Sequence, residues 1–212
     1  MEESAPRFAF LRVSPEVKYP KTSPMDFETL LVKIGTILED LSIPYCITGG
    51  YAVSVWGRPR GTFDIDVVVE LQAKNLKPLV RHLRELSSSG YIEERTAQDA
   101  IREGKEFNYF HPESGIKIDF WVITPRDRMG REKLQRRIGR KIEGRAIYFI
   151  SPEDLILSKL IWFQKTQSTR QLEDIESVLK IQKSLDMSYL RQAAKANATL
   201  EILEPLLHSR EQ

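Results

Sequence analysis

A pair of acidic residues at the start of an apolar run constrains the fold more than any other feature of the sequence. Asp64 and Asp66 precede three valines, and residues 63–70 alternate before they become continuously apolar. This pattern is typical of a central strand. Side chains two positions apart on a strand lie on one face, with backbones about 7 Å apart. The two carboxylates are therefore expected side by side, where their mutual repulsion would disfavour burial.

A third acidic residue stands in a similar setting. Asp119 lies among apolar residues of an expected strand over residues 116–123. If this strand neighbours the one that carries the acidic pair, all three carboxylates converge. Mg²⁺ takes oxygen ligands, and two ions about 3.5–4 Å apart can share such a cluster. The sequence therefore predicts a metal site for Mg²⁺, with two ions expected and Mn²⁺ as the alternative metal, at Asp64, Asp66 and Asp119.

Two adjacent glycines separate an expected strand from an expected helix. The apolar run at residues 45–48 leads into Gly49 and Gly50, and residues 51–56 are compatible with a helix. Glycine lets the backbone approach a phosphate closely, and a helix N-terminus adds unpaired N–H groups and the positive end of its dipole. The bend therefore predicts a phosphate cradle. Further groups that suit an anion are the Thr62 hydroxyl and the guanidinium groups of Arg58 and Arg60.

Each of these motifs has an ordinary structural explanation when taken alone. A Gly-Gly pair is usually a turn, an Asp-x-Asp motif is often an exposed strand edge, and Asp119 alone could lie in a turn or an ion pair. Three acids that each stand beside apolar strand residues are hard to explain as solvated surface. Their order and spacing together favour a functional site.

The rest of the first 150 residues predicts further helices and strands. Apolar residues at helical spacing predict helices over residues 26–41 and 74–86, the first capped by Ser23. Residues 91–95 are expected to form a short strand, and residues 97–104 a polar helix or loop. The remaining expected strands are 106–110 and 116–123, joined as a hairpin through 111–115, and 146–150.

The character of the sequence changes at Ser151, which supplies a helix N-cap followed by proline. Helices are expected over residues 152–165, 169–183 and 186–207, the last broken near Asn197. Residues 1–24 hold four prolines and predict an irregular arm with one short strand at 8–13. We expect an α/β (α+β) fold in which helices flank a small mixed sheet. Its expected parts are an arm (1–24), a catalytic domain (25–150) and a C-terminal helical subdomain (151–212).

Composition excludes several classes of protein. The chain has 212 residues with one cysteine and three histidines, so an internal disulfide and a cysteine-based zinc site are both excluded. Cys46 itself is expected to be a buried apolar residue. We find no apolar run long enough for a membrane span and no signal-peptide pattern. The expected location is cytoplasmic, in a reducing compartment.

Charge is distributed unevenly although the net charge is only +2. Residues 126–145 contain nine basic and three acidic residues, a local charge of +6. Such a segment is either a solvated face or a surface that meets phosphate groups, including those of a nucleic acid. Among single residues, His111 is expected at the surface in the hairpin turn. The three tryptophans are expected in cores, with Trp121 as the one that could line a cleft beside Asp119.

Four motifs resemble those of the nucleotidyltransferase superfamily that includes DNA polymerase β. They are TGGYA at 48–52, RGTFDID at 60–66, SPEDLILSKL at 151–160 and STRQLEDI at 168–175. The closer resemblance is to the minimal bacterial and archaeal members, which are grouped with the type IV toxin nucleotidyltransferases. It covers roughly residues 26–190. Toxin-type members often carry Lys-Asp and then a second Asp in the last motif, whereas this chain has Glu173-Asp174 and then Ser177.

The resemblance implies a role for each matching residue. Asp64 and Asp66 would hold Mg²⁺ against the triphosphate of an NTP, and Asp119 would complete a second metal site and act as base toward the acceptor. Asp174 would be structural or would position the substrate. The residues that would bind the nucleotide are Gly49, Gly50, Arg60, Thr62 and Lys159.

The expected function is therefore Mg²⁺-dependent transfer of a nucleoside monophosphate from an NTP to an acceptor hydroxyl. The acceptor is open between RNA (tRNA included), a protein side chain and a small molecule. Two alternatives keep the fold without the chemistry: a catalytically silent nucleotide-binding module, and a nucleic-acid-binding module that uses the basic segment. The oligomeric state is not predicted from the sequence, and no membrane partner is expected.

Overall fold

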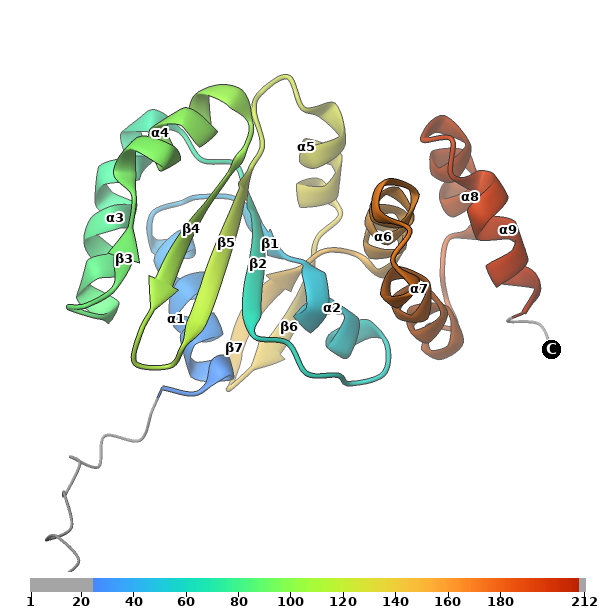
Figure 1. The fold of residues 1–212 in the computed structure, drawn as a ribbon, viewed down its shortest axis with the longest axis horizontal. Helices are drawn as coiled ribbons and strands as arrows, with labels where there is room; N and C mark the ends of the chain where they lie inside the picture. The colour runs from blue at the N-terminus through green and yellow to red at the C-terminus, as the bar shows by residue number, and fades with distance from the viewer. Residues whose placement is uncertain (1–24, 210–212) are drawn as a thin grey trace, which may run out of the picture.

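A computed structural model describes residues 25–209 of the chain. Its central feature is a mixed seven-stranded sheet in the order β3-β4-β5-β2-β1-β7-β6 (Figure 1). Helices cover the sheet, as expected for an α/β fold. The strands are β1 (Tyr45–Ile47), β2 (Asp64–Val69), β3 (Tyr91–Ile92), β4 (Glu106–His111), β5 (Ile116–Val122), β6 (Ile138–Ile142) and β7 (Arg145–Phe149).

The helices fall into groups along the chain. Helices α3 and α4 lie beside the β3–β4 side of the sheet, whereas α6 to α9 gather on the other side of the molecule, beyond α2 (Figure 1). The helices are α1 (Phe27–Asp40), α2 (Gly49–Trp56), α3 (Ala73–Leu86), α4 (Glu94–Glu103), α5 (Arg128–Gln135), α6 (Pro152–Thr166), α7 (Thr169–Ile181), α8 (Met187–Ala196) and α9 (Leu200–His208).

The centre of the sheet brings together strands that are distant in sequence. Strand β2 pairs antiparallel with β1 and parallel with β5, while β4 and β5 form the expected antiparallel hairpin. Along β2, burial alternates: Ile65, Val67 and Val69 are fully buried, and Asp64 and Asp66 are half-buried on the other face. One face of this strand therefore belongs to the core, and the other is free to form a site.

Most expected elements occur within a few residues of their predicted bounds. The break near Asn197 is found between α8 and α9, and Cys46 is fully buried. Ser151 caps α6 as expected, because its hydroxyl accepts a hydrogen bond from the Asp154 N–H at 3.1 Å. The expected strand at 8–13 lies outside the described residues, and the division into an arm and two domains stays a prediction.

Several local expectations were wrong. Helix α1 is capped by Asp26, whose carboxylate accepts from the Thr29 N–H at 2.8 Å. His111 is 1% exposed rather than at the surface, because β4 extends to it and its ring contacts the Ser114 hydroxyl. Trp162 is 44% exposed rather than in a core. Helix α5 and strand β6 were not predicted, since their charged sequences show little apolar periodicity.

Candidate active site

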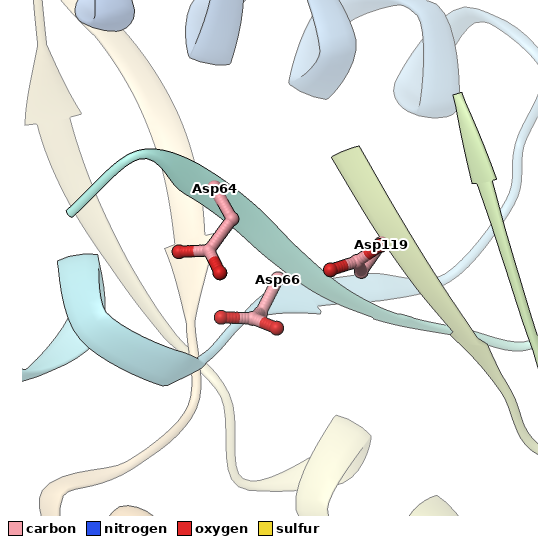
Figure 2. Close-up of side chains that lie close together, drawn as sticks. All are labelled: Asp64, Asp66 and Asp119. Atoms are coloured by element: carbon pink, nitrogen blue, oxygen red, sulfur yellow. The ribbon is translucent and has the colours of Figure 1, made fainter. Parts of the chain in front are cut away.

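The three acidic residues lie together on one face of the sheet. Strands β2 and β5 are parallel neighbours in a register that places Asp66 opposite Asp119, and Asp64 lies two positions before Asp66 on the same face of β2. Each residue offers a carboxylate oxygen within 4.8 Å of the others. Figure 2 shows the three side chains on the same side of the two strands. The expected convergence of the carboxylates is therefore observed.

Asp66 is the member of the carboxylate cluster whose ionisation is most affected by its surroundings. Burial raises the pKa of Asp66, and the charges of Asp64 and Asp119 raise it further, against the opposing effects of a Trp121 hydrogen bond and the Lys159 charge. A raised carboxyl pKa means that the ionised form is disfavoured there. Oxygen-rich, mutually repelling ligands of this kind suit Mg²⁺, so the donor set fits the metal expected from the sequence.

Two polar contacts hold the outer carboxylates in place. The Thr62 hydroxyl donates to Asp64 Oδ1 at 2.7 Å, and Lys117 Nζ lies 2.8 Å from Asp119 Oδ2. Thr62, which was expected to contact phosphate, thus orients one of the proposed metal ligands. Lys117 was not among the predicted site residues, although its position two before Asp119 on the same strand places it on the same face.

The glycine bend lies directly against the carboxylate cluster. Gly49 opens α2 with φ +64°, and a Cβ at this position would lie 1.8 Å from Asp66 Oδ2. A Cβ on Gly50 would lie 2.6 Å from the Thr62 hydroxyl oxygen. Only glycine therefore allows the N-terminus of α2, with its unpaired N–H groups, to approach Asp66 this closely. Helix α2 begins two residues earlier than expected, so the glycines form its first turn.

The two predicted phosphate-binding cations are held by one buried acid. Arg60 donates to Asp174 through Nε at 2.7 Å and Nη2 at 2.9 Å, and Lys159 Nζ lies 2.8 Å from the same carboxylate. Asp174 is only 3% exposed. Burial raises its pKa, but hydrogen bonds from Arg60 and Lys159 outweigh that effect and hold the pKa below its usual value. Asp174 thus ties α7 to α6 and to the loop before β2.

Several of these groups line one cavity of about 490 Å³. Its size is within the range of small-molecule sites. Besides the glycines, Asp64, Asp66, Arg60, Thr62 and Lys159, the cavity is lined by Trp121, Lys133, Trp162 and Gln171. Trp162 lies three residues after Lys159 and Gln171 three before Asp174, so helical spacing from the motif residues was the signal that could have identified them.

The basic segment at 126–145 reaches the cavity through Lys133, which also donates to the Ser158 hydroxyl at 3.0 Å. Other members form intramolecular contacts. Arg136 pairs with buried Asp154 and donates to the Tyr189 hydroxyl, and the Arg137 and Arg140 guanidinium groups lie over aromatic rings. Much of this segment is therefore structural.

Comparison with known families decides the class of protein. The family model described as "Nucleotidyltransferase of unknown function (DUF6036)" matches residues 27–206. The chain belongs to this nucleotidyltransferase family. The cluster of Asp64, Asp66 and Asp119 is consistent with the catalytic site of such an enzyme. A search of the curated proteins finds no match.

Solved nucleotidyltransferase structures share the fold. An antigenic nucleotidyltransferase-like protein from Paracoccidioides brasiliensis is 20% identical with a TM-score of 0.56, and the match covers 89% of this chain and 92% of that chain. The lincosamide antibiotic adenylyltransferase LnuA is 19% identical with a TM-score of 0.50, covering 72% and 96%. ANT(2'')-Ia, solved with adenylyl-2''-tobramycin, is 17% identical with a TM-score of 0.49, covering 87% and 98%. At these identities a likeness concerns the fold alone. The likeness to the Paracoccidioides brasiliensis protein, together with the mixed seven-stranded sheet, confirms the expected fold class.

No helix within residues 25–209 is both long enough and apolar enough to cross a membrane.

Proposed function

We propose that this nucleotidyltransferase family member catalyses Mg²⁺-dependent transfer of a nucleoside monophosphate from an NTP, ATP included, to an acceptor hydroxyl. The observation that carries the proposal is the convergence of Asp64, Asp66 and Asp119 beside the Gly49-Gly50 bend, where Asp64 and Asp66 line one cavity with Lys159. Carboxylates for a divalent metal and a phosphate-accepting helix N-terminus are the two parts that phosphoryl transfer requires.

The residues of this chain would divide the work between binding and proton transfer. The first turn of α2 would receive phosphate oxygens through its N–H groups, and Lys159 and Arg60 would offset the negative charge of the triphosphate. Asp174 holds both cations in position. Asp119 would accept the proton of the acceptor hydroxyl, while Lys117 keeps its carboxylate oriented.

The reaction follows from this placement. The acceptor oxygen forms a bond to the α-phosphorus as the bond from that phosphorus to pyrophosphate breaks, and holding both reactants in one cavity supplies much of the rate enhancement. Mg²⁺ held by Asp64, Asp66 and Asp119 would stabilise the charge on the attacking and leaving oxygens.

The acceptor is proposed only as a hydroxyl of RNA, protein or a small molecule. LnuA is named as a lincosamide antibiotic adenylyltransferase, which makes hydroxylated antibiotics one small-molecule class to include in a screen. Toxin-like activity is not proposed, because Ser177 stands where toxin-type members carry a second acid.

The test is label transfer from each NTP. The protein is incubated with Mg²⁺ and NTPs labelled at the α-phosphate, together with total RNA, total protein or a panel of hydroxylated small molecules. We expect α-label to appear in one acceptor fraction. In parallel reactions with NTPs labelled at the γ-phosphate, we expect the label to be released. The Asp64→Asn variant should lose the transfer, whereas Asp40→Asn, at an exposed position at the end of α1, should retain it.

Three results would contradict the proposal. Transfer that persists in Asp64→Asn would remove the carboxylate cluster from the chemistry. NTP binding without transfer to any fraction would favour the catalytically silent nucleotide-binding module instead. Salt-dependent retention of RNA without NTP binding would favour the nucleic-acid-binding module.

A further inference from the structure

One end of the cavity is formed by two tryptophans and a glutamine that the proposed reaction does not use. Trp121 comes from β5, Trp162 from α6 and Gln171 from α7, and all three line the cavity that holds the carboxylates. The two indole rings meet edge to face, with centroids 6.0 Å apart and an interplanar angle of 73°. Trp162 keeps 44% of its surface exposed, although Lys165 Nζ lies over its ring at 5.8 Å from the centroid.

This aromatic end lies next to the charged end of the cavity, which is lined by Asp64, Asp66 and Lys159. Trp121 is two residues after Asp119 on the same face of β5, and the Trp121 indole hydrogen bond influences Asp66. Trp162 and Gln171 each lie about one helical turn from the Lys159–Asp174 ion pair, on α6 and α7 respectively. A ligand with its phosphates at the glycine bend could therefore reach the tryptophans with its other end.

Gln171 has an unsatisfied polar atom at this end. Its Oε1 is buried and has no hydrogen-bond partner within residues 25–209. A buried amide oxygen without a donor is unfavourable, and most such atoms in folded proteins are paired. A half-turn of the amide would exchange oxygen and nitrogen, so the group can accept from or donate to a ligand.

We infer that this end of the cavity is the subsite for the base of the NTP and that Gln171 determines which base is preferred. The inference rests on the proposed function, because it assumes an NTP with its phosphates at Gly49 and Gly50. A nucleobase offers a flat face that stacks on indole rings and an edge of donors and acceptors that an amide can pair with. The charged end makes contacts that are the same for every NTP, so discrimination has to come from the aromatic end.

The test compares nucleotides with a probe that has phosphates but no base. Dissociation constants are measured by calorimetry with Mg²⁺ for ATP, GTP, CTP, UTP and inorganic tripolyphosphate. The variants are Gln171→Leu and Trp162→Leu, and the matched control is Gln98→Leu, at an exposed position on α4.

The wild-type protein should bind its preferred NTP more tightly than tripolyphosphate. Gln171→Leu should raise the Kd of that NTP by about three- to tenfold, the equivalent of one hydrogen bond, and reduce the differences among the four NTPs. Trp162→Leu should raise the Kd of all four, by at least about fivefold if stacking is lost. Neither variant should change the Kd of tripolyphosphate, which also shows that each is folded, and Gln98→Leu should match the wild type.

The outcomes separate this inference from the proposed function. NTP binding that is unchanged in both variants would overturn the inference. If transfer were lost in these variants while NTP binding stayed unchanged, the aromatic end would be assigned to the acceptor instead. Equal weakening of NTP and tripolyphosphate would also overturn it, because the effect would then act at the phosphate end. Wild-type protein that binds neither probe would overturn the proposed function and the inference together.

Discussion

Replacing Gly49 with alanine tests whether the glycine bend and the carboxylates form one unit. Gly49 has φ +64°, and the added Cβ would lie 1.8 Å from Asp66 Oδ2 and 2.5 Å from its Cγ. Real Cβ atoms keep at least 3.0 Å from such neighbours, so the Asp66 carboxylate has to move by 1.2 Å or more. The substitution therefore changes the metal site without replacing a proposed ligand.

The two consequences of the substitution differ in size. A left-handed backbone costs a non-glycine residue about 1–2 kcal/mol, which corresponds to roughly 2–8 °C in melting temperature for a domain of this size. Most of the clash involves the end of a flexible side chain, which rotation of Asp66 moves away. The remaining contact, with the Asp66 Cβ at 2.9 Å, needs only a small backbone shift, so the further expense in folding free energy is small. That rotation removes a ligand from the cluster, and we expect Mg²⁺ affinity to fall at least about tenfold.

Gly115→Ala is the matched control. Gly115 has φ +69°, and a Cβ there meets no atom of residues 25–209 within 4 Å, so this variant carries the backbone strain without the clash. Melting temperature and the Kd of Mg²⁺ or Mn²⁺ are measured for both variants. Both should lose a similar amount of stability, and only Gly49→Ala should lose metal affinity. Wild-type metal affinity in Gly49→Ala, or an equal loss in Gly115→Ala, would refute the reasoning.

Two further predictions concern the ionisable groups. Because the pKa of Asp66 is raised in the folded protein, its ionisation removes stability as the pH rises through that raised value. In EDTA at pH 7, the melting temperature of Asp66→Asn should therefore be no lower than that of the wild type. Added Mg²⁺ should raise the melting temperature of the wild type only. A lower melting temperature for Asp66→Asn in EDTA would contradict this. Asp174 has a lowered pKa in the folded protein, so its ionised form stabilises the fold at neutral pH. This stabilisation is lost as the pH falls through the folded-state pKa of Asp174. At pH 7, Asp174→Asn should lower the free energy of unfolding, measured with denaturant, by about 3–5 kcal/mol. Glu173→Gln, at an exposed position, should leave it almost unchanged. Equal effects of the two substitutions would contradict the ion-pair argument.

Local sequence signals predicted most of the secondary structure. Helices such as α3 and the β4–β5 hairpin depend on apolar spacing and turn residues within a few positions, which are visible in the sequence. Helix α5 and strand β6 were missed because long-range contacts stabilise them. Within the part of the chain that the structure describes, strand β6 is an edge strand that pairs only with β7, and its residues show no alternation that would identify it.

The burial of single residues was harder to predict. His111 opens an exposed-looking turn in the sequence, but it ends β4 opposite Ile116 and is enclosed there. Trp162 is large and apolar, yet it faces the cavity instead of the core. Burial of a side chain depends on which elements pack over it, and that packing involves partners far along the chain.

The sequence by itself determined that Asp64 and Asp66 share one face of a strand and that two glycines precede a helix, because strand alternation and glycine chemistry are local. Only the tertiary structure decided that β5 lies beside β2 in the register that brings Asp119 to Asp66. It also decided that Asp174 binds both Arg60 and Lys159. Strand order and helix packing result from burying apolar surface contributed by the whole chain, so no single segment could specify them.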